Sequence, residues 1–172
     1  EVRPIRAEDA PLITSFHGQL SEESIRFRYF HNKADLSQRD LSMLSHINYD
    51  RQMAFIAEHP LEDGSKEMLG VVRVWNDPDN IRPEVSIIIR DDLQGLGIGK
   101  LLMERMIRYS KGVGPLEMVG EIMADNHPMR ALMRQLGFRQ RYNMEEQVVD
   151  AVLRLNEPRS EWQRHRLEAL TD

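Results

Sequence analysis

A glycine-rich stretch between a predicted strand and a predicted helix is the strongest chemical signal in the sequence. It reads QGLGIGK at residues 94–100 and follows the pattern Gln-x-x-Gly-x-Gly, with Gln94, Gly97 and Gly99 at the fixed positions. Backbone N–H groups that open a helix form a nest, which attracts phosphate together with the positive end of the helix dipole. The stretch therefore predicts a pyrophosphate-binding loop, in which side chains at the glycines would block the phosphates. A tight connection, in which glycine only relaxes the backbone, is the alternative.

Two other phosphate-binding motifs do not match this stretch. A P-loop requires Gly-x-x-x-x-Gly-Lys-Ser/Thr, but Gln94 stands at its first glycine and Leu101 replaces the hydroxyl residue. A dinucleotide fingerprint requires Gly-x-Gly-x-x-Gly in a parallel βαβ unit, whereas here glycine recurs at every second position after a predicted hairpin. The sequence therefore excludes both motifs.

Hydrophobic patterns before the glycine loop predict a short strand, three helices and a hairpin. These elements are expected at residues 1–6 (strand), 7–20, 21–30 and 36–47 (helices), and 53–59 and 68–75 (hairpin strands). A further strand at residues 83–90 leads into the loop. Its unbroken apolar run predicts burial on both faces.

Helices and strands alternate after the loop. The first helix ends near Gly112 and places one stripe of residues on a common face: Ile98, Leu101, Leu102, Arg105 and Tyr109. Later elements are expected at residues 116–123 (strand), 125–138 (helix), 139–144 and 147–155 (strand pair), and after Pro158 (short helix with Ser160 and Gln163 as capping box). This order predicts a mixed α/β domain at residues 1–157, with antiparallel and parallel parts, and a helical tail at residues 158–172.

The composition narrows the classes of function. The 172 residues suit one domain, and a content of 41% hydrophobic and 30% charged residues is ordinary for a globular protein. The net charge of −5 argues against nucleic-acid binding, which needs a basic surface. The absence of cysteine excludes disulfides, thiolate metal sites and cysteine-linked intermediates, and agrees with a reducing, cytoplasmic location. The six histidines show no metal-binding spacing.

Together these features resemble the GNAT superfamily of acyl-CoA N-acyltransferases. The resemblance runs from EVRPIRAEDA to VLRL and includes the element order, the loop QGLGIGK and the downstream DNHPMRALMRQLGF. More narrowly, INYDRQMAFIAE, EVSIIIRDDLQGLGIGKLLMERMI and NHPMRALMRQLGF are similar to the acetyltransferase domain of bacterial Pat-type protein lysine acetyltransferases. In that family the domain follows a large region similar to acyl-CoA synthetases. Because the chain begins at Glu1 without Met, we expect it to be a domain of such a longer protein.

The resemblance implies acetyl-CoA as the acyl donor. Its pyrophosphate would bind mainly to backbone amides of the loop residues Gln94, Gly95, Leu96, Gly97, Ile98, Gly99 and Lys100. Its pantetheine arm and acetyl carbonyl would pair with main-chain groups of Ile87, Ile88 and Ile89, whose alternative role is core packing. Asn126 matches an asparagine that contacts the CoA arm in this family, and its alternative role is that of a helix N-cap.

Glu84, ten positions before Gln94, matches the strand position at which many GNAT enzymes keep a general base. An unperturbed lysine amine has a pKa of about 10.4, so that freeing it at pH 7 costs roughly 4–5 kcal/mol. A carboxylate that accepts the proton lowers this cost, whereas the alternative is a surface glutamate at a strand end. Many GNAT enzymes also carry a tyrosine that protonates the departing thiolate. Seven positions after Asn126 this chain has Met133, which cannot donate, so solvent protonates CoA or the thiolate leaves unprotonated.

In this superfamily the acceptor groove lies between the early helices and the last strand pair. Four acidic residues would then lie near an incoming lysine, unless they are ordinary surface charges: Glu22, Glu23, Glu145 and Glu146. We therefore expect a protein lysine Nε-acetyltransferase that acts by direct attack, with metabolic enzymes such as acyl-CoA synthetases as its protein partners. The alternatives are a small-molecule amine N-acetyltransferase and a non-catalytic module that senses acyl-CoA.

Overall fold

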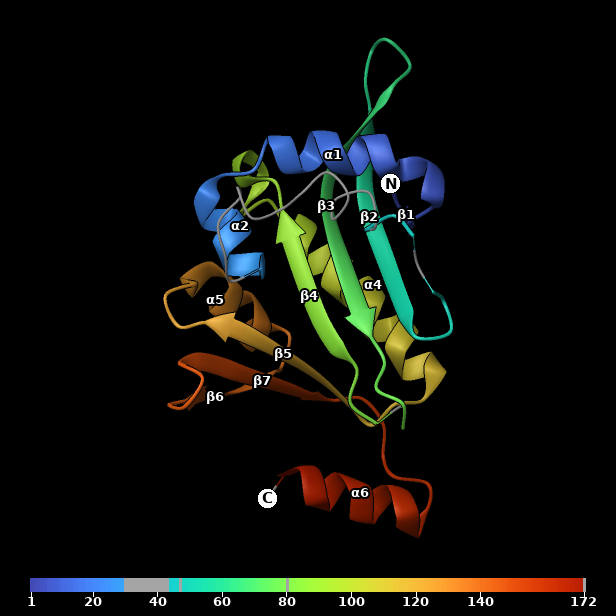
Figure 1. The fold of residues 1–172 in the computed structure, drawn as a ribbon, viewed down its shortest axis with the longest axis vertical. Coiled ribbons are helices and arrows are strands. Elements are labelled where there is room, and N and C mark those ends of the chain that lie inside the picture. Colours follow the sequence, from blue (N-terminus) through green and yellow to red (C-terminus); the bar gives the residue numbers. More distant parts are fainter. Residues whose placement is uncertain (30–43, 47, 80, 172) are drawn as a thin grey trace.

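The computed structural model describes residues 1–29, 44–46, 48–79 and 81–171, and these form one mixed β-sheet with flanking helices (Figure 1). The strands are β1 Val2–Pro4, β2 Gln52–Pro60, β3 Lys66–Trp75, β4 Glu84–Ile89, β5 Glu117–Met123, β6 Arg139–Asn143 and β7 Val148–Arg154. The helices are α1 Ala10–Gly18, α2 Glu22–Tyr29, α4 Ile98–Val113, α5 His127–Gln135 and α6 Glu161–Thr171, with 3-10 turns at Ala7–Asp9 and Asp91–Leu93. The predicted mixed α/β fold is confirmed. The helix predicted at residues 36–47 lies largely outside the described residues.

The sheet consists of two antiparallel halves joined by one parallel contact. Its strand order is β1-β2-β3-β4-β5-β7-β6. Strands β1 to β4 pair antiparallel, and so do β5, β7 and β6. Between β4 and β5 the register joins Glu84 to Val119, and beyond this pair the two strands diverge (Figure 1). The facing edges of β4 and β5 therefore have no strand partner within the described part of the chain.

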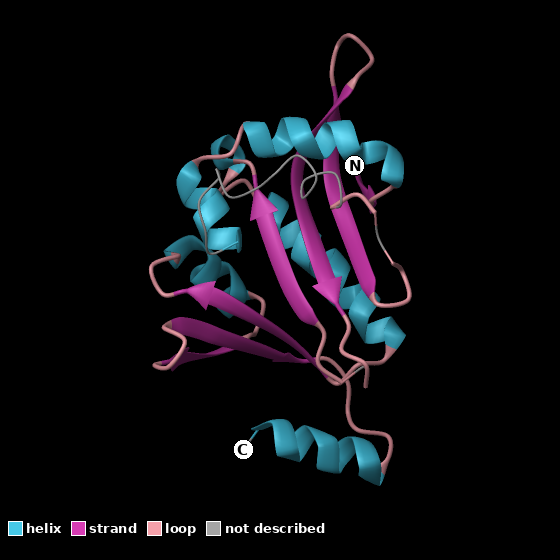
Figure 2. Cartoon of the chain, in the orientation of Figure 1, coloured by secondary structure: helices cyan, strands magenta, loops and turns pink. Residues whose placement is uncertain are grey.

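Helices cover both faces of the sheet, with α4 on one face and α1 on the other (Figure 2). Val85 and Ile87 of β4 belong to the core on the α4 face, whereas Ile88 belongs to the core on the α1 face. Since neighbouring side chains of a strand point to opposite faces, β4 is buried on both, as its apolar run predicts. This burial fixes β4 in the centre of the molecule.

The face of α4 that contacts the sheet matches the predicted stripe in part. Leu102 is fully buried, and Ile98 and Tyr109 pack against the same core, but Leu101 is 54% exposed. The other buried residues of the helix are Met103, Met106 and Ser110. The prediction is wrong for Leu101 because the helix is apolar over a wider arc than the sheet can cover.

The C-terminal helix α6 begins with the predicted pair of capping residues. Ser160 Oγ accepts a hydrogen bond from the N–H of Gln163 at 3.1 Å, and Gln163 Oε1 accepts one from the N–H of Arg159 at 2.8 Å. The return bond therefore reaches one residue further back than in the usual capping box. Among the helices described, none combines the length and apolar character needed to cross a lipid bilayer.

Candidate active site

A cavity of about 870 Å³ occupies the space between the diverging strands β4 and β5. Its walls come from β4, β5, α2, α5 and the glycine loop that precedes α4. Ser86 and Ile87 are neighbours on β4 and point to opposite faces of the sheet, yet both line the cavity. The cavity therefore reaches both faces, with α5 lining it on the α4 face and α2 on the α1 face.

The glycine loop adopts left-handed backbone at two positions. Gly95 has a φ of 85°, and Gly97, the N-cap of α4, has a φ of 86°. Side chains are strained in this conformation, which explains the choice of glycine. A Cβ at either position would have no heavy atom within 4 Å, so the space beside the loop is open to a ligand. Because glycine supplies no capping oxygen, the first N–H groups of α4 receive none from their N-cap and are free for an anion.

Gly99 has a packing role beside the predicted one. A Cβ at Gly99 would lie 3.3 Å from Leu132 Cδ2 and 3.7 Å from Ile89 Cγ1. A side chain there would crowd α5 and β4, so this glycine lets α4 pack closely against its neighbours. Gly99 also lines the cavity, and its contact with a pyrophosphate stays a prediction.

The remaining loop residues divide between the cavity and the outside. Gln94 and Lys100 line the cavity, as do the three glycines of the loop. Leu96 is 69% exposed and does not line it. Ile98 packs against the core on the α4 face. A pyrophosphate would thus meet the glycine positions and the start of α4 rather than every residue of the stretch.

The three isoleucines of β4 have the expected packing role and also line the cavity. Ile87 and Ile88 are 6% and 5% exposed and belong to the two cores, while all of Ile87, Ile88 and Ile89 line the cavity. Their main chain lies where β4 has already separated from β5. Main-chain donors and acceptors on this edge are therefore open to an extended ligand, which would bind as an added strand does.

Asn126 also serves two purposes. Its Oδ1 accepts a hydrogen bond from the N–H of Met129 at 3.3 Å, so it is the N-cap of α5. Asn126 is 8% exposed and lines the cavity. The side-chain oxygen is used by the cap, which leaves the amide N–H groups of Asn126 as the donors available to a ligand.

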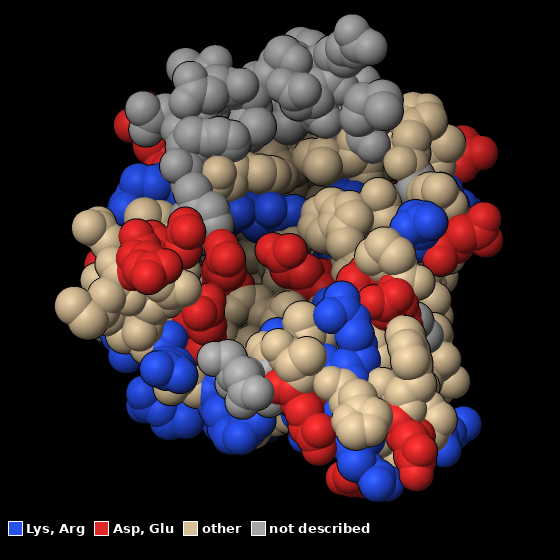
Figure 3. All heavy atoms as spheres, turned by 60° about the horizontal axis from the view of Figure 1, so that its bottom comes forward, with Lys and Arg blue, Asp and Glu red and all other residues tan. Residues whose placement is uncertain are grey.

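Three carboxylates among the described residues lie close enough to Glu121 of β5 to act on its charge. Glu84 is exposed at the β4–β5 pair, beside the residues that line the cavity. Glu121 of β5 lines the cavity itself. Partial burial, and then the charges of Glu84, Asp150 and Glu146, raise the pKa of Glu121. Figure 3 shows acidic side chains gathered around a hollow on the face that lies at the bottom of Figure 1. Sequence reasoning missed Glu121, although one charged residue inside an apolar strand is a signal for it.

The four acidic residues predicted on the acceptor side occupy different places. Glu23 lines the cavity, whereas Glu22 is exposed in the first turn of α2 and does not. Glu145 and Glu146 are exposed in the β6–β7 turn, where both N–H groups donate to Asn143 Oδ1, at 3.0 and 3.1 Å. Of these two, Glu146 contributes to the raised pKa of Glu121.

Met133 occupies the position at which the family resemblance leads one to expect a proton-donating tyrosine. It is 2% exposed and lines the cavity. The site therefore offers helix and loop N–H groups for an anion, an open strand edge for an extended chain and carboxylates for an amine or its proton. It does not offer an acidic hydroxyl at this position.

Comparison with known proteins agrees with this geometry. The family model described as the acetyltransferase (GNAT) domain matches residues 1–139. An acetyltransferase of Pseudomonas aeruginosa is 33% identical over 138 residues, which cover 80% of this chain and 73% of the relative.

Solved structures with the same fold include one with a related sequence. The GNAT domain of S. lividans PAT has a TM-score of 0.78 at 26% identity, covering 90% of this chain and 89% of that one. The yncA protein of Salmonella typhimurium, solved with its cofactor acetyl-CoA, has a TM-score of 0.70 at 18% identity, covering 93% and 96%. A spermidine N-acetyltransferase of Vibrio cholerae, in complex with CoA and spermine, has a TM-score of 0.71 at 18% identity, covering 90% and 95%. At 18% identity, the last two likenesses show the fold alone.

Proposed function

Since the chain belongs to the acetyltransferase (GNAT) family and is an acetyl-CoA-dependent N-acetyltransferase, we propose that its acceptor is the ε-amine of lysine side chains in proteins. The choice of acceptor is supported by the likeness in sequence and fold to the GNAT domain of S. lividans PAT. This choice of acceptor also agrees with the resemblance of the sequence to Pat-type protein lysine acetyltransferases. The observation that carries the proposal is the cavity that reaches both faces of the sheet, because donor and acceptor can then approach one point from opposite ends.

The donor end of the cavity fits acetyl-CoA. Open space beside Gly97, the uncapped start of α4 and the free edge of β4 suit a diphosphate followed by an extended arm. Acetyl-CoA supplies an activated acetyl group. The chain's own contribution is to hold the diphosphate at the glycine loop and to align the arm along Ile87, Ile88 and Ile89.

At the acceptor end, the chain must receive an ammonium group and remove its proton. The carboxylates near the β4–β5 junction attract the ammonium, and we assign the general base to Glu84. Freeing a lysine amine at pH 7 costs roughly 4–5 kcal/mol, which a base at this junction offsets in part. Glu121 is the second carboxylate within reach of the same place, so it is the natural comparison for Glu84 in mutagenesis.

We propose metabolic enzymes, with acyl-CoA synthetases first, as the protein acceptors, and the cytoplasm as the place of reaction. The first turn of α2 and the β6–β7 turn are exposed, so a lysine on the surface of a folded protein has access to this end of the cavity. Contacts between the two proteins would orient the amine for attack, and a small amine cannot supply them.

The test compares two acceptors under the same conditions. The protein is incubated with acetyl-CoA and either a folded acyl-CoA synthetase or spermidine, and acetylated lysines are mapped by mass spectrometry. We expect kcat/KM for the folded protein to exceed that for spermidine by about 100-fold or more, because binding contacts remote from the amine raise the rate. Equal or faster turnover of spermidine would overturn the protein-acceptor proposal. A reaction without enzyme measures spontaneous acetylation.

A further inference from the structure

Arg73 carries a buried guanidinium with an unpartnered nitrogen in the described part of the chain. It lies on β3, is 4% exposed, and its Nη2 has no hydrogen-bond partner among the described residues. Burial, together with the positive charge of Arg28, lowers the pKa of Arg73 to about 10. A buried charge is costly unless something pairs with it, so the position calls for an explanation.

Arg28 of α2 lies beside Arg73 and lines the cavity. Its guanidinium is 4.5 Å from the ring centroid of Tyr29 and 5.8 Å from that of Trp75, so aromatic faces hold it in place. Burial lowers the pKa of Arg28, and the negative charge of Glu84 opposes this shift, but the two side chains form no ion pair. Two cationic groups are thus held together with aromatic support and without a bound carboxylate in the described part of the chain.

Ser86 completes this group. In the register of β3 and β4 it lies directly opposite Arg73, so the two side chains share a face of the sheet. Its Oγ is buried, has no hydrogen-bond partner among the described atoms, and belongs to a residue that lines the cavity. Glu84 precedes Ser86 by two positions and therefore points to the same face.

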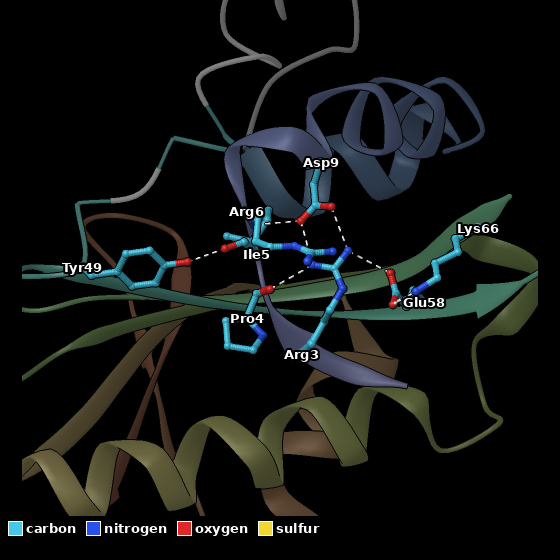
Figure 4. A network of polar contacts seen from close by, with 8 residues as sticks. All are labelled: Arg3, Pro4, Ile5, Arg6, Asp9, Tyr49, Glu58 and Lys66. Carbon is cyan, nitrogen blue, oxygen red and sulfur yellow. Dashed lines mark hydrogen bonds and ion pairs between the residues drawn. The ribbon is translucent and has the colours of Figure 1, made fainter.

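Two other inward-facing arginines, Arg3 and Arg90, are paired with carboxylates. Arg3 donates to Asp9 at 2.8 and 2.9 Å and to Glu58 at 2.9 Å, and Lys66 completes that network (Figure 4). Arg90 likewise pairs with both Glu67 and Asp92: the N–O distances are 2.9 and 2.7 Å. Carboxylates thus pair with Arg3 and Arg90, whereas the described residues supply none to Arg73.

We propose that Arg28, Arg73 and Ser86 bind a carboxylate that the acceptor carries close to its reacting amine. This inference rests on the proposed function and narrows it to lysines that have an acidic neighbour. A single guanidinium can match a planar carboxylate through two parallel N–H donors, and the second guanidinium and the serine hydroxyl add further donors. The same pair repels a polycation such as spermidine. An acidic side chain of a protein and the α-carboxylate of a free amino acid share this chemistry, so the test must separate them.

The test measures how acetylation depends on an acceptor carboxylate. Two peptides with blocked α-amines differ in one residue, Glu or Gln, next to their single lysine, and free glutamate is the third acceptor. For the wild type we expect kcat/KM for the Glu peptide to exceed that for the Gln peptide by roughly 10- to 150-fold, the range of charge-assisted hydrogen bonds. In Arg73→Met and Arg28→Met this ratio should fall to about threefold or less.

Arg26→Met is the matched control, because Arg26 lies on the same helix as Arg28 but pairs with Asp125 at 2.9 Å. It should keep the wild-type ratio. Arg73→Lys keeps the charge and loses the planar fork, so it should retain part of the preference even if Arg73→Met folds poorly.

The outcomes separate this inference from the proposed function. A wild-type ratio near one, or an equal loss in Arg26→Met, would overturn the carboxylate site while leaving lysine acetylation intact. If free glutamate reacts faster than both peptides and needs Arg73, the carboxylate site stands and the protein-acceptor proposal fails.

Discussion

Gly97→Asp should abolish tight acetyl-CoA binding while the domain stays folded. Asp tolerates left-handed backbone better than most residues, and a Cβ at Gly97 meets no heavy atom within 4 Å. The variant should therefore fold, with a stability loss of about 1 kcal/mol from the φ of 86°. Its carboxylate would stand beside the start of α4, where we place the pyrophosphate.

The expected loss of affinity follows from the distance between the charges. Two negative charges about 5 Å apart repel by about 3 kcal/mol at an effective dielectric constant of about 20, which corresponds to roughly 200-fold in Kd. Salt will screen little of this at about 0.1 M, since the Debye length is then about 10 Å. Gly97→Asn has nearly the same shape without the charge, so it should weaken binding by less than about tenfold.

Gly64→Asp is the matched control for backbone strain. Gly64 lies in the β2–β3 turn with a φ of 85°, and a Cβ there also has no heavy atom within 4 Å. Urea unfolding should give similar stability losses for the two Asp variants, and calorimetry should give wild-type affinity for Gly64→Asp. The reasoning is refuted if folded Gly97→Asp binds acetyl-CoA within about fivefold of wild type, or if Gly97→Asn loses as much as Gly97→Asp.

Three further predictions concern the general base Glu84, the ion-pair network around Glu58, and the core face of α4. Glu84→Gln should bind acetyl-CoA normally and lose about 10²–10⁴-fold in kcat at pH 7, a loss that shrinks at alkaline pH where the acceptor amine is already neutral; an undiminished kcat would move the role to Glu121, the next variant to measure. Glu58→Gln should cost about 1.5–3 kcal/mol at neutral pH in urea unfolding. Hydrogen bonding to Arg3 lowers the pKa of Glu58, so this stability is present above the ordinary carboxyl pKa and is lost as pH falls below about 4, where wild type and variant should converge. Leu102→Ala should cost about 2–5 kcal/mol, and Leu101→Ala less than about 0.5 kcal/mol, so equal losses would contradict the assigned face of α4.

Features set by local sequence were predicted well. The β2–β3 hairpin, the glycine loop at Gly95 and Gly97, and the cap of α6 at Ser160 each depend on a few neighbouring residues with strong conformational preferences. The N-cap role of Asn126 is confirmed by its hydrogen bond from Met129. Its contact with the CoA arm and the phosphate site of the loop stay predictions, although both line the cavity.

Features set by contacts between distant segments were not predictable. No pattern in β4 or β5 indicates that they pair at Glu84 and then separate, since this depends on how the helices cover each half of the sheet. In the sequence Arg73 looks like an ordinary strand residue. Its buried position without a partner among the described residues is visible only when β3, β4 and α2 are assembled. Leu101 and Leu102 are both apolar, so periodicity alone did not decide which of them faces the sheet.

The divergence of β4 and β5 places two strand edges inside the molecule instead of at its rim. An exposed edge invites pairing with other chains and aggregation, but these edges face each other across a cavity that α2 and α5 help to enclose. The wall that α2 contributes belongs to a different segment from β4. Substitutions on the exposed face of α2 would reshape the acceptor end without disturbing the main-chain donors and acceptors of β4. The architecture is therefore easy to diversify, because new acceptor specificities can arise while one donor is kept.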